Sequence, residues 1–387
     1  KLFIIILKYH FMRILVAPDK FRGSLEASEV CRAVEEGVKL AYPEALVQEI
    51  PLADGGEGTT EILTRYSKGR IIYVQTQDPL GRMMEAAYGL SADGNTAFIE
   101  MASASGLNLL RSEEHNPMLT STYGTGLMLL DAIRNGALNI ILGIGGSATT
   151  DGGIGMAAAL GYRFLDEKEE ELTLIGGNLI KVKRIDTSQV VHEIQGVNVT
   201  VACDVTNELY GRNGAAYVYG PQKGATQQMV ELLDAGLMNL SKVATNTFGK
   251  DVSVVPGSGA AGGLGAGCLW FLNAQLKEGV GIVMEQTKVE ESIQISDLVI
   301  TGDGKVDEQT LSGKVVKGLA ELCQKHNTPL AVVCGTLLIS PEDIKQAGIT
   351  YAVSVINKPM SLEEAQSNAF RLVKEATFNL VRLFFKS

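Results

Sequence analysis

The sequence lacks several short motifs by which nucleotide-binding and metal-dependent enzymes are commonly identified. No G-x-x-x-x-G-K-[ST] segment occurs in its 387 residues, and the first apolar run leads into Pro18-Asp19-Lys20-Phe21 rather than G-x-G-x-x-G. H-E-x-x-H is also missing, and the four histidines show no metal-ligand spacing. These absences exclude a P-loop and a common zinc hydrolase site, and they disfavour an ordinary nicotinamide-binding domain.

Cysteine is also scarce, and the net charge is negative rather than positive. The five cysteines are odd in number, widely spaced and without a C-x-x-C pair, which predicts reduced, buried thiols in a cytoplasmic protein. The formal net charge of −10 argues against nucleic acid or an anionic membrane as the main partner.

Long hydrophobic runs are missing too. Residues 3–7 are apolar, but this run is too short to span a membrane, and no small-residue cleavage site follows it. Because Met12 opens a clean strand pattern, we expect residues 1–11 to be a non-native or disordered extension. An added edge strand is the alternative.

Glycine, by contrast, is abundant, with 43 residues in 387. Much of it falls in four loops, of which three carry carboxylates: 54–58, 145–153, 256–263 and 301–307. Glycine lets backbone N–H groups approach an anion closely, and nearby carboxylates can hold a divalent cation or accept a proton. This pairing is what phosphoryl transfer requires, so the loops indicate a kinase.

Apolar runs alternate with helical patterns at both ends of the chain. Residues 13–17 and 46–50 read as strands around a helix that Ser24 would cap, and the same alternation returns after residue 297. We therefore predict an α/β protein with two domains. A Rossmann-like parallel-sheet domain is formed by residues 12–75 plus 290–387, and a mixed α/β domain, residues 76–289, is inserted into it. Within the insert, strands are expected near 198–203 and 215–219.

Two pairs of charged residues follow the first two strands, where ligands bind in open α/β sheets. Asp19 could meet a metal or a substrate hydroxyl and Lys20 an anion, although a solvated surface turn also fits. Asp54 and Glu57 flank two glycines, which is more than a turn needs.

The second and third glycine loops have the composition of phosphate cradles. Residues 143–155 combine glycines with hydroxyls and Asp151, which could ligate Mg²⁺, and residues 256–265 open a helix whose amides suit an anion. Structural loops, and close packing of a helix on a sheet, are the competing explanations.

Further polar residues follow other predicted strands. Asp204 could be a base or a metal ligand and Asn207 an orienting group, with turn capping almost as good an explanation. Lys223 places a cation at a turn, which is a weak signal alone. Asp303 and Asp307 lie in a predicted glycine turn, and cation binding explains them better than a role as surface charges on a helix.

Taken together, eight segments in collinear order resemble the glycerate kinase family, and the resemblance covers essentially Met12 to the C-terminus. They are Ala17-Pro18-Asp19-Lys20-Phe21, residues 53–58, 100–106, 143–153, 203–207, 220–224, 257–263 and 301–309. Thr150 and Asp303 depart from the pattern, since relatives often carry asparagine and glutamate there. Both replacements keep oxygen ligands.

The resemblance implies ATP-dependent phosphorylation of D-glycerate with Mg²⁺, at a site in the cleft between the two domains. The 2-phosphoglycerate product is favoured over 3-phosphoglycerate. Asp204, Asp19 and Lys20 are expected to be catalytic, with Asp204 the first choice as base. Substrate binding is expected from Asp54, Glu57, Ser103, Lys223 and Asn207. Nucleotide binding is expected from Gly145, Gly146, Ser147, Thr149, Gly257, Gly259, Gly262 and Gly263, and metal binding from Asp151, Asp303 and Asp307.

Two functions from other classes stay open at this point. One is an NAD-linked oxidoreductase acting on hydroxy acids, and the other is a non-catalytic glycerate-binding sensor on the same scaffold. The second would be marked by loss of the loop carboxylates, which this chain retains. A homodimer is an open alternative to a monomer.

Overall fold

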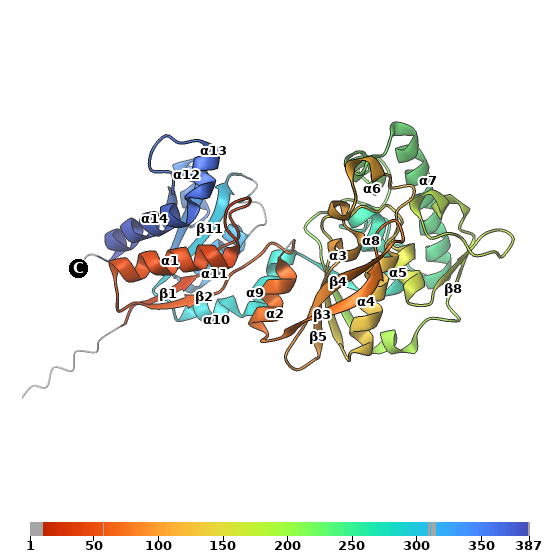
Figure 1. Cartoon of the computed structure of the whole chain (residues 1–387), viewed down its shortest axis with the longest axis horizontal. Helices are drawn as coiled ribbons and strands as arrows, with labels where there is room; N and C mark the ends of the chain where they lie inside the picture. Colours follow the sequence, from red (N-terminus) through yellow and green to blue (C-terminus); the bar gives the residue numbers. More distant parts are fainter. Residues whose placement is uncertain (1–10, 57, 309, 311–314, 386–387) are drawn as a thin grey trace, which may run out of the picture. The chain divides into compact units, whose positions relative to one another are not determined.

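Both ends of the chain contribute strands to one parallel sheet of five strands. The computed structural model describes residues 11–56, 58–308, 310 and 315–385 (Figure 1). In the sheet order β13-β12-β11-β1-β2, the first strand pairs with β2 on one side and with β11, from the last third of the chain, on the other. The predicted β-α-β start is therefore confirmed.

Contacts between residues divide the chain into two units, of which unit 1 comprises residues 1–54 and 283–387 and unit 2 residues 55–282. The strands of unit 1 are β1 (Arg13–Val16), β2 (Leu46–Glu49), β11 (Leu298–Val306), β12 (Leu330–Leu337) and β13 (Tyr351–Ser354). Its helices are α1 (Ala27–Ala41), α10 (Val289–Gln294), α11 (Val315–His326), α12 (Pro341–Gln346), α13 (Leu362–Ser367) and α14 (Ala369–Phe384). Helix α9 (Gly279–Thr287) contains the second point at which the chain passes from one unit to the other.

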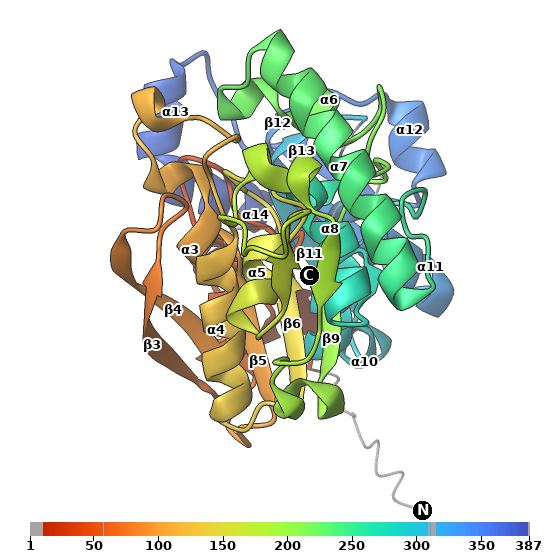
Figure 2. The ribbon, with the colours of Figure 1, turned by 90° about the vertical axis from the view of Figure 1, so that its right-hand side faces the viewer.

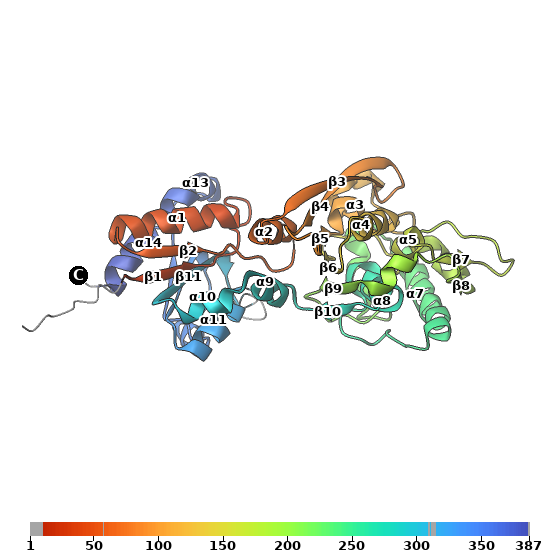
Figure 3. The ribbon, with the colours of Figure 1, turned by 90° about the horizontal axis from the view of Figure 1, so that it is seen from below.

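Helices cover both faces of the unit 1 sheet. Figure 3 shows α1 and α14 on one face and α10 and α11 on the other. Helices α1 and α14 approach closely because Gly37 has no side chain: a Cβ there would lie 2.5 Å from the Lys374 carbonyl oxygen. Val30, Val34 and Val38 turn the apolar stripe of α1 inward, onto the sheet.

Unit 2 is built around a mixed sheet of six strands in the order β10-β9-β6-β5-β4-β3. Its strands are β3 (Arg70–Gln77), β4 (Met83–Leu90), β5 (Thr96–Glu100), β6 (Asn139–Gly143), β9 (Asn198–Ala202) and β10 (Gln275–Lys277), with a separate pair β7 (Arg163–Leu165) and β8 (Arg184–Asp186). Its α-helices are α2 (Thr59–Tyr66), α3 (Ala102–Ser105), α4 (Tyr123–Arg134), α5 (Ile154–Ala159), α6 (Ala215–Tyr219), α7 (Gln227–Phe248) and α8 (Ala260–Phe271). Short 3₁₀ turns are η1 (Leu107–Leu109), η2 (Ser112–Glu114), η3 (Gly176–Lys181), η4 (His192–Gly196) and η5 (Pro221–Lys223).

The four strands from β5 to β10 are parallel, whereas β3 and β4 add an antiparallel edge. Figure 2 shows β3, β4, β5, β6 and β9 across unit 2, with α4 and α5 lying in front of them. Each unit has its own buried apolar core. Mixed α/β architecture with a parallel sheet agrees with the predicted fold class.

The division between the units differs from the predicted boundaries. The first crossing, at 54–55, precedes the boundary expected near 75, because α2 and β3 belong with the second sheet, where β3 pairs along its whole length with β4. The second crossing, at 282–283, lies near the expected 290.

Several local predictions were wrong. Residues 215–219, expected as a strand, form α6, whose Ala215 and Ala216 are buried against neighbouring helices. Packing has overridden the strand preference of Tyr217-Val218-Tyr219. Glu26 rather than Ser24 caps α1, through a capping box with Glu29.

Residues 1–10 lie outside the described residues, and with them the edge-strand alternative. Over the part of the chain that the structure describes, no helix combines the length and apolarity that a membrane crossing requires.

Candidate functional site

Near the carboxyl end of β1, the negative charges of two carboxylates of unit 1 act on the pKa of a third, Asp19. The Asp19 N–H donates to the Gly302 carbonyl at 2.9 Å, which joins the loop after β1 to β11. The pKa of Asp19 is raised to about 7, chiefly by burial and also by the negative charges of Asp54 and Asp303, while a 2.7 Å hydrogen bond from the Lys20 N–H acts in the opposite direction. Asp19 is thus a carboxyl group whose protonation changes near neutral pH.

Asp303 and Asp307, predicted together in a glycine turn as metal ligands, lie in different surroundings: Asp303 is part of β11, and Asp307 follows the last residue of that strand. An Asp303 oxygen accepts a hydrogen bond from the Lys305 N–H at 3.1 Å. Asp307 forms an ion pair with the Lys305 amine at 2.7 Å and accepts from the Thr310 N–H, and these contacts lower its pKa to about 2. Glu57, the predicted partner of Asp54, lies outside the described residues.

In unit 2, the loop that follows β6 is held by a buried lysine. The Lys223 amine donates to the Ser147 hydroxyl at 2.7 Å and to the Thr149 carbonyl at 2.6 Å. Lys223 is only 2% exposed, and burial lowers its pKa to about 7 although the charge of nearby Asp151 acts in the opposite direction. Ser147 and Thr149, predicted to bind the nucleotide, are therefore in contact with Lys223, predicted to bind the substrate.

The same loop is fixed a few residues later by Asp151, which is completely buried. Its carboxylate accepts from the Thr122 N–H at 2.7 Å, from the Thr122 hydroxyl at 2.8 Å, and from the N–H groups of Gly153 and Gly155. Burial nevertheless raises its pKa, because the hydrogen bonds do not offset the loss of water. These are the contacts of a group that ties the loop to the start of α4.

The third glycine loop packs directly on the second. Ala261, Gly262 and Gly263 all have left-handed backbone angles within α8, which kinks there. The Gly152 N–H donates to the Gly262 carbonyl at 3.1 Å, and Gly259 donates to the Asn207 carbonyl at 2.9 Å. The structure thus brings together the two loops predicted to cradle phosphates, within one unit.

Thr149 and Thr150 lie at this contact and are fully buried. Among the described residues, neither hydroxyl has a hydrogen-bond partner. Unpaired buried polar groups are uncommon in folded proteins, and they concentrate where function has shaped the backbone.

Asp204, Asn207 and Ser103 occupy other parts of unit 2. An Asp204 oxygen accepts from the Gly279 N–H at 2.7 Å. The Asn207 side chain accepts from the Tyr219 hydroxyl and donates to the Asn213 carbonyl, so both of its polar ends have partners. Ser103 lies half-buried in α3.

The sequence interpretation missed two residues that hold predicted site residues. Thr122 anchors Asp151 and Gly279 anchors Asp204. A hydroxyl residue before the apolar run of α4 was the available signal for Thr122. Gly279 donates through its backbone and left no signal in the sequence.

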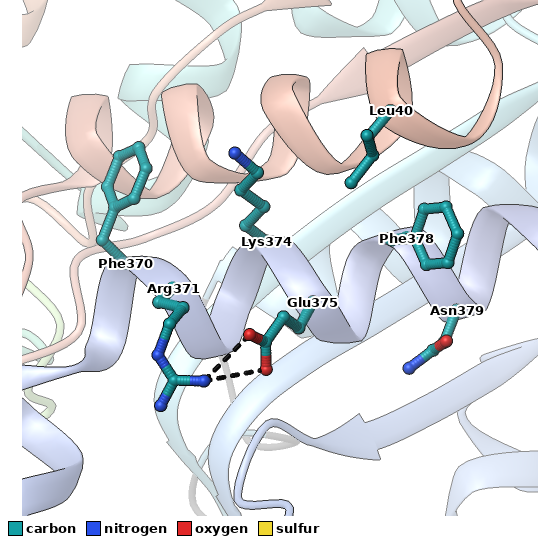
Figure 4. A pocket seen from close by; sticks show the side chains of 7 residues that line it. All are labelled: Leu40, Phe370, Arg371, Lys374, Glu375, Phe378 and Asn379. Atoms are coloured by element: carbon teal, nitrogen blue, oxygen red, sulfur yellow. Dashed lines mark hydrogen bonds and ion pairs between the residues drawn. The ribbon is translucent and has the colours of Figure 1, made fainter.

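Over the described residues, no three His, Cys, Asp or Glu side chains lie close enough to hold a metal ion between them. A pocket between α1 and α14 is lined by Leu40, Phe370, Arg371, Lys374, Glu375, Phe378 and Asn379, with Arg371 paired to Glu375 (Figure 4). None of the predicted site residues lines that pocket.

Known proteins resemble this chain over nearly its whole length. The glycerate kinase from Halalkalibacterium halodurans is 45% identical over 95% of this chain and 97% of its own, and the glycerate 2-kinase from Escherichia coli is 42% identical with the same coverage. A crystal structure described as that of a candidate glycerate kinase 2 from Salmonella typhimurium LT2 matches with a TM-score of 0.89 at 40% identity, covering 97% of this chain and 98% of that one. The model of the glycerate kinase family matches residues 14–385, and the chain belongs to that family.

Proposed function

We propose that this chain transfers the γ-phosphoryl group of ATP to a hydroxyl of D-glycerate, with 2-phosphoglycerate as the favoured product. The observation that carries the proposal is the family match over residues 14–385, supported by relatives named glycerate kinase and glycerate 2-kinase. None of the relatives reported above is named an oxidoreductase or a sensor, so neither alternative gains support.

The packed glycine loops suit the nucleotide phosphates. Loop 145–153 and the kinked start of α8 offer backbone N–H groups in left-handed conformations, and such backbone forms concave anion sites. We assign the predicted contacts of Gly145, Gly146 and Gly257 to phosphate oxygens, whereas the Gly259 N–H already donates to the Asn207 carbonyl. Catalysis in this class of reaction comes mainly from positioning and from neutralising charge.

For the proton of the glycerate hydroxyl, Asp19 and Asp204 remain the candidates. The pKa of Asp19, about 7, suits a base that must be ionised at neutral pH yet still hold a proton. Asp204 already accepts a hydrogen bond from Gly279 through one oxygen, and its other oxygen would have to act. Lys20, next to Asp19, is proposed to contact an anionic group of the substrates.

Mg²⁺ is the implied metal, and the three predicted ligands suit it unequally. Asp303 fits best, because its charge, like that of Asp54, acts on the Asp19 carboxylate, and Mg²⁺ prefers carboxylate oxygens as ligands. Asp307 is already neutralised by Lys305, and the Asp151 carboxylate is enclosed by donors. When bound, the ion would neutralise phosphate charge.

A coupled assay with ATP and D-glycerate, followed by phosphorus NMR of the product, tests the activity and the position of transfer. Activity on another hydroxy acid with none on D-glycerate would refute the proposed substrate. Asp19→Asn and Asp204→Asn separate the two bases: the variant that lacks the base should lose at least about a hundredfold in turnover together with the acidic limb of its pH profile. The other variant should keep that limb.

Three further predictions stay untested: a cytoplasmic location, the absence of nucleic-acid partners and the open choice between monomer and homodimer. Light scattering coupled to size-exclusion chromatography would decide the last of them.

A further inference from the structure

Lys223 lies at the end of a short turn that neighbouring helices hold in place. The turn η5 connects α6 with α7, and it is closed by hydrogen bonds from the Lys223 and Ala225 N–H groups to the Gly220 carbonyl, at 3.0 and 3.1 Å. Gly224 follows with a left-handed φ of 89°, and a Cβ there would lie 2.2 Å from the His115 carbonyl oxygen. The backbone that carries Lys223 therefore has little freedom to move.

The amine of Lys223 reaches from this turn to a loop more than seventy positions earlier in the chain. Its two hydrogen bonds, to the Ser147 hydroxyl and the Thr149 carbonyl, span 76 and 74 positions. They contact the loop at two alternate residues. With Asp151 tied to Thr122, the loop 145–151 is held by a buried cation and, a few residues later, by a buried carboxylate.

This position is unsuited to direct contact with a substrate. The side chain is 2% exposed, and two of its donor positions are already used by protein groups at 2.6 and 2.7 Å. A lysine amine is costly to remove from water, and the lowered pKa of Lys223 reflects that cost. A fold that only needed to fill this space could use an apolar side chain.

We infer that Lys223 is a positioning residue, which fixes the conformation of loop 145–151 from its buried side and touches neither glycerate nor phosphate. The inference rests on the proposed function in one respect, namely that this loop binds the nucleotide. It replaces the expectation that Lys223 binds the substrate directly. The contacts to Ser147 and to the Thr149 backbone are the route by which it acts.

Substitution of Lys223 should therefore change nucleotide binding selectively. Lys223→Met keeps the length and apolar stem but removes both hydrogen bonds. We expect the Kd for ADP, measured by titration calorimetry, to rise at least about tenfold, as for the loss of supporting contacts around other binding sites. The KM for D-glycerate should stay within about twofold. Lys242→Met, an exposed lysine on α7, is the matched control and should leave both values unchanged.

Two results would overturn the inference. A raised KM for D-glycerate with normal ADP affinity would mean that Lys223 contacts the substrate. An unchanged KM for D-glycerate together with an unchanged Kd for ADP would mean that the contacts of Lys223 with Ser147 and Thr149 have no role in binding. If Lys223→Met does not fold, as judged by circular dichroism, Ser147→Ala removes one of the two contacts instead. Normal ADP affinity in that variant would refute the route through Ser147.

The ADP titration also separates this inference from the proposed activity. Wild-type protein that binds ADP but does not phosphorylate D-glycerate would refute the proposed function, while the comparison of ADP affinities would still decide the role of Lys223. Wild-type protein that binds no ADP would refute both.

Discussion

Gly262 lies so close to Thr149 that a Cβ on the glycine would be 2.0 Å from the threonine carbonyl oxygen. It would also lie 2.6 Å from the Thr150 Cα, so backbone surrounds this position rather than the end of a flexible side chain. The Thr149 carbonyl is the same group that accepts from Lys223. Gly262, in α8, therefore packs against loop 145–151 at the residue whose carbonyl accepts a hydrogen bond from Lys223.

Gly262→Ala should lower stability and nucleotide affinity together. The backbone φ of 69° already disfavours a side chain, and the overlap with Thr149 adds to that strain. We expect the free energy of unfolding to fall by at least about 2 kcal/mol in urea titrations. Gly196→Ala is the control, because nothing lies within 4 Å of a Cβ there, and it should change stability by less than about 0.5 kcal/mol. Equal effects of the two substitutions would contradict the packing described here.

Asp19 should make the protein less stable as the pH rises towards neutrality. Its pKa is raised from the ordinary 3.8 to about 7, so between these values the folded state keeps a proton that the unfolded chain has lost. The stabilising contribution is complete below the lower value and is lost as the pH rises through the upper one. In Mg²⁺-free buffer, Asp19→Asn should be more stable than wild type at pH 8, by about 1–4 kcal/mol.

At pH 5, near the low end of this window, the advantage of Asp19→Asn should be smaller. Urea denaturation of both proteins at the two pH values measures it. If the difference in free energy of unfolding between Asp19→Asn and wild type is the same at both pH values, or is larger at pH 5, the pKa of Asp19 is not raised.

Removal of divalent cations should abolish the activity, and Asp303, within β11, should differ in its effect on the metal from Asp307, which follows that strand. Asp303→Asn should raise the Mg²⁺ concentration for half-maximal rate at least about tenfold. Asp307→Asn should raise it less, because Lys305 already pairs with that carboxylate. Rates measured across a Mg²⁺ titration provide the test, and a larger effect of Asp307→Asn would reverse the assignment.

The close packing of α1 on α14 should contribute to the stability of unit 1. In Gly37→Ala the new methyl group would overlap the Lys374 carbonyl oxygen and the Thr377 side chain, at 2.5 and 2.8 Å. Separating the two helices should destabilise the fold by about 1–3 kcal/mol. Arg32→Ala, on the exposed side of α1, should cost less than about 0.5 kcal/mol. Thermal unfolding of both variants distinguishes these outcomes.

Patterns of local sequence predicted most strands and helices because they depend on short spacings. The apolar runs at β1, β2 and β9 were identified in this way, and strand ends located Asp19 and Asp204. The failures occurred where distant packing decides the outcome. Residues 215–219 carry a strand composition, yet α7 and α8 enclose them as a helix.

The contacts within the loops were beyond the reach of such patterns. Neither the lysine at 223 nor the serine at 147 shows in sequence that the two side chains touch. Asp151 was predicted as a Mg²⁺ ligand, and only the fold reveals that its carboxylate is buried and accepts hydrogen bonds from Thr122. Burial of a charged group depends on the whole unit, so residue type alone could not separate ligands from anchors.

The order of strands in the unit 1 sheet has a consequence for synthesis of the chain. β1 lies between β2 and β11, but β11 begins only at Leu298, after all of unit 2 has been made. At translation rates of about 5–20 residues per second, β1 waits roughly ten seconds or more for this neighbour, while unit 2 is an uninterrupted segment that can complete its own sheet in that time. β1 therefore leaves the ribosome before unit 2 but is among the last strands to finish pairing.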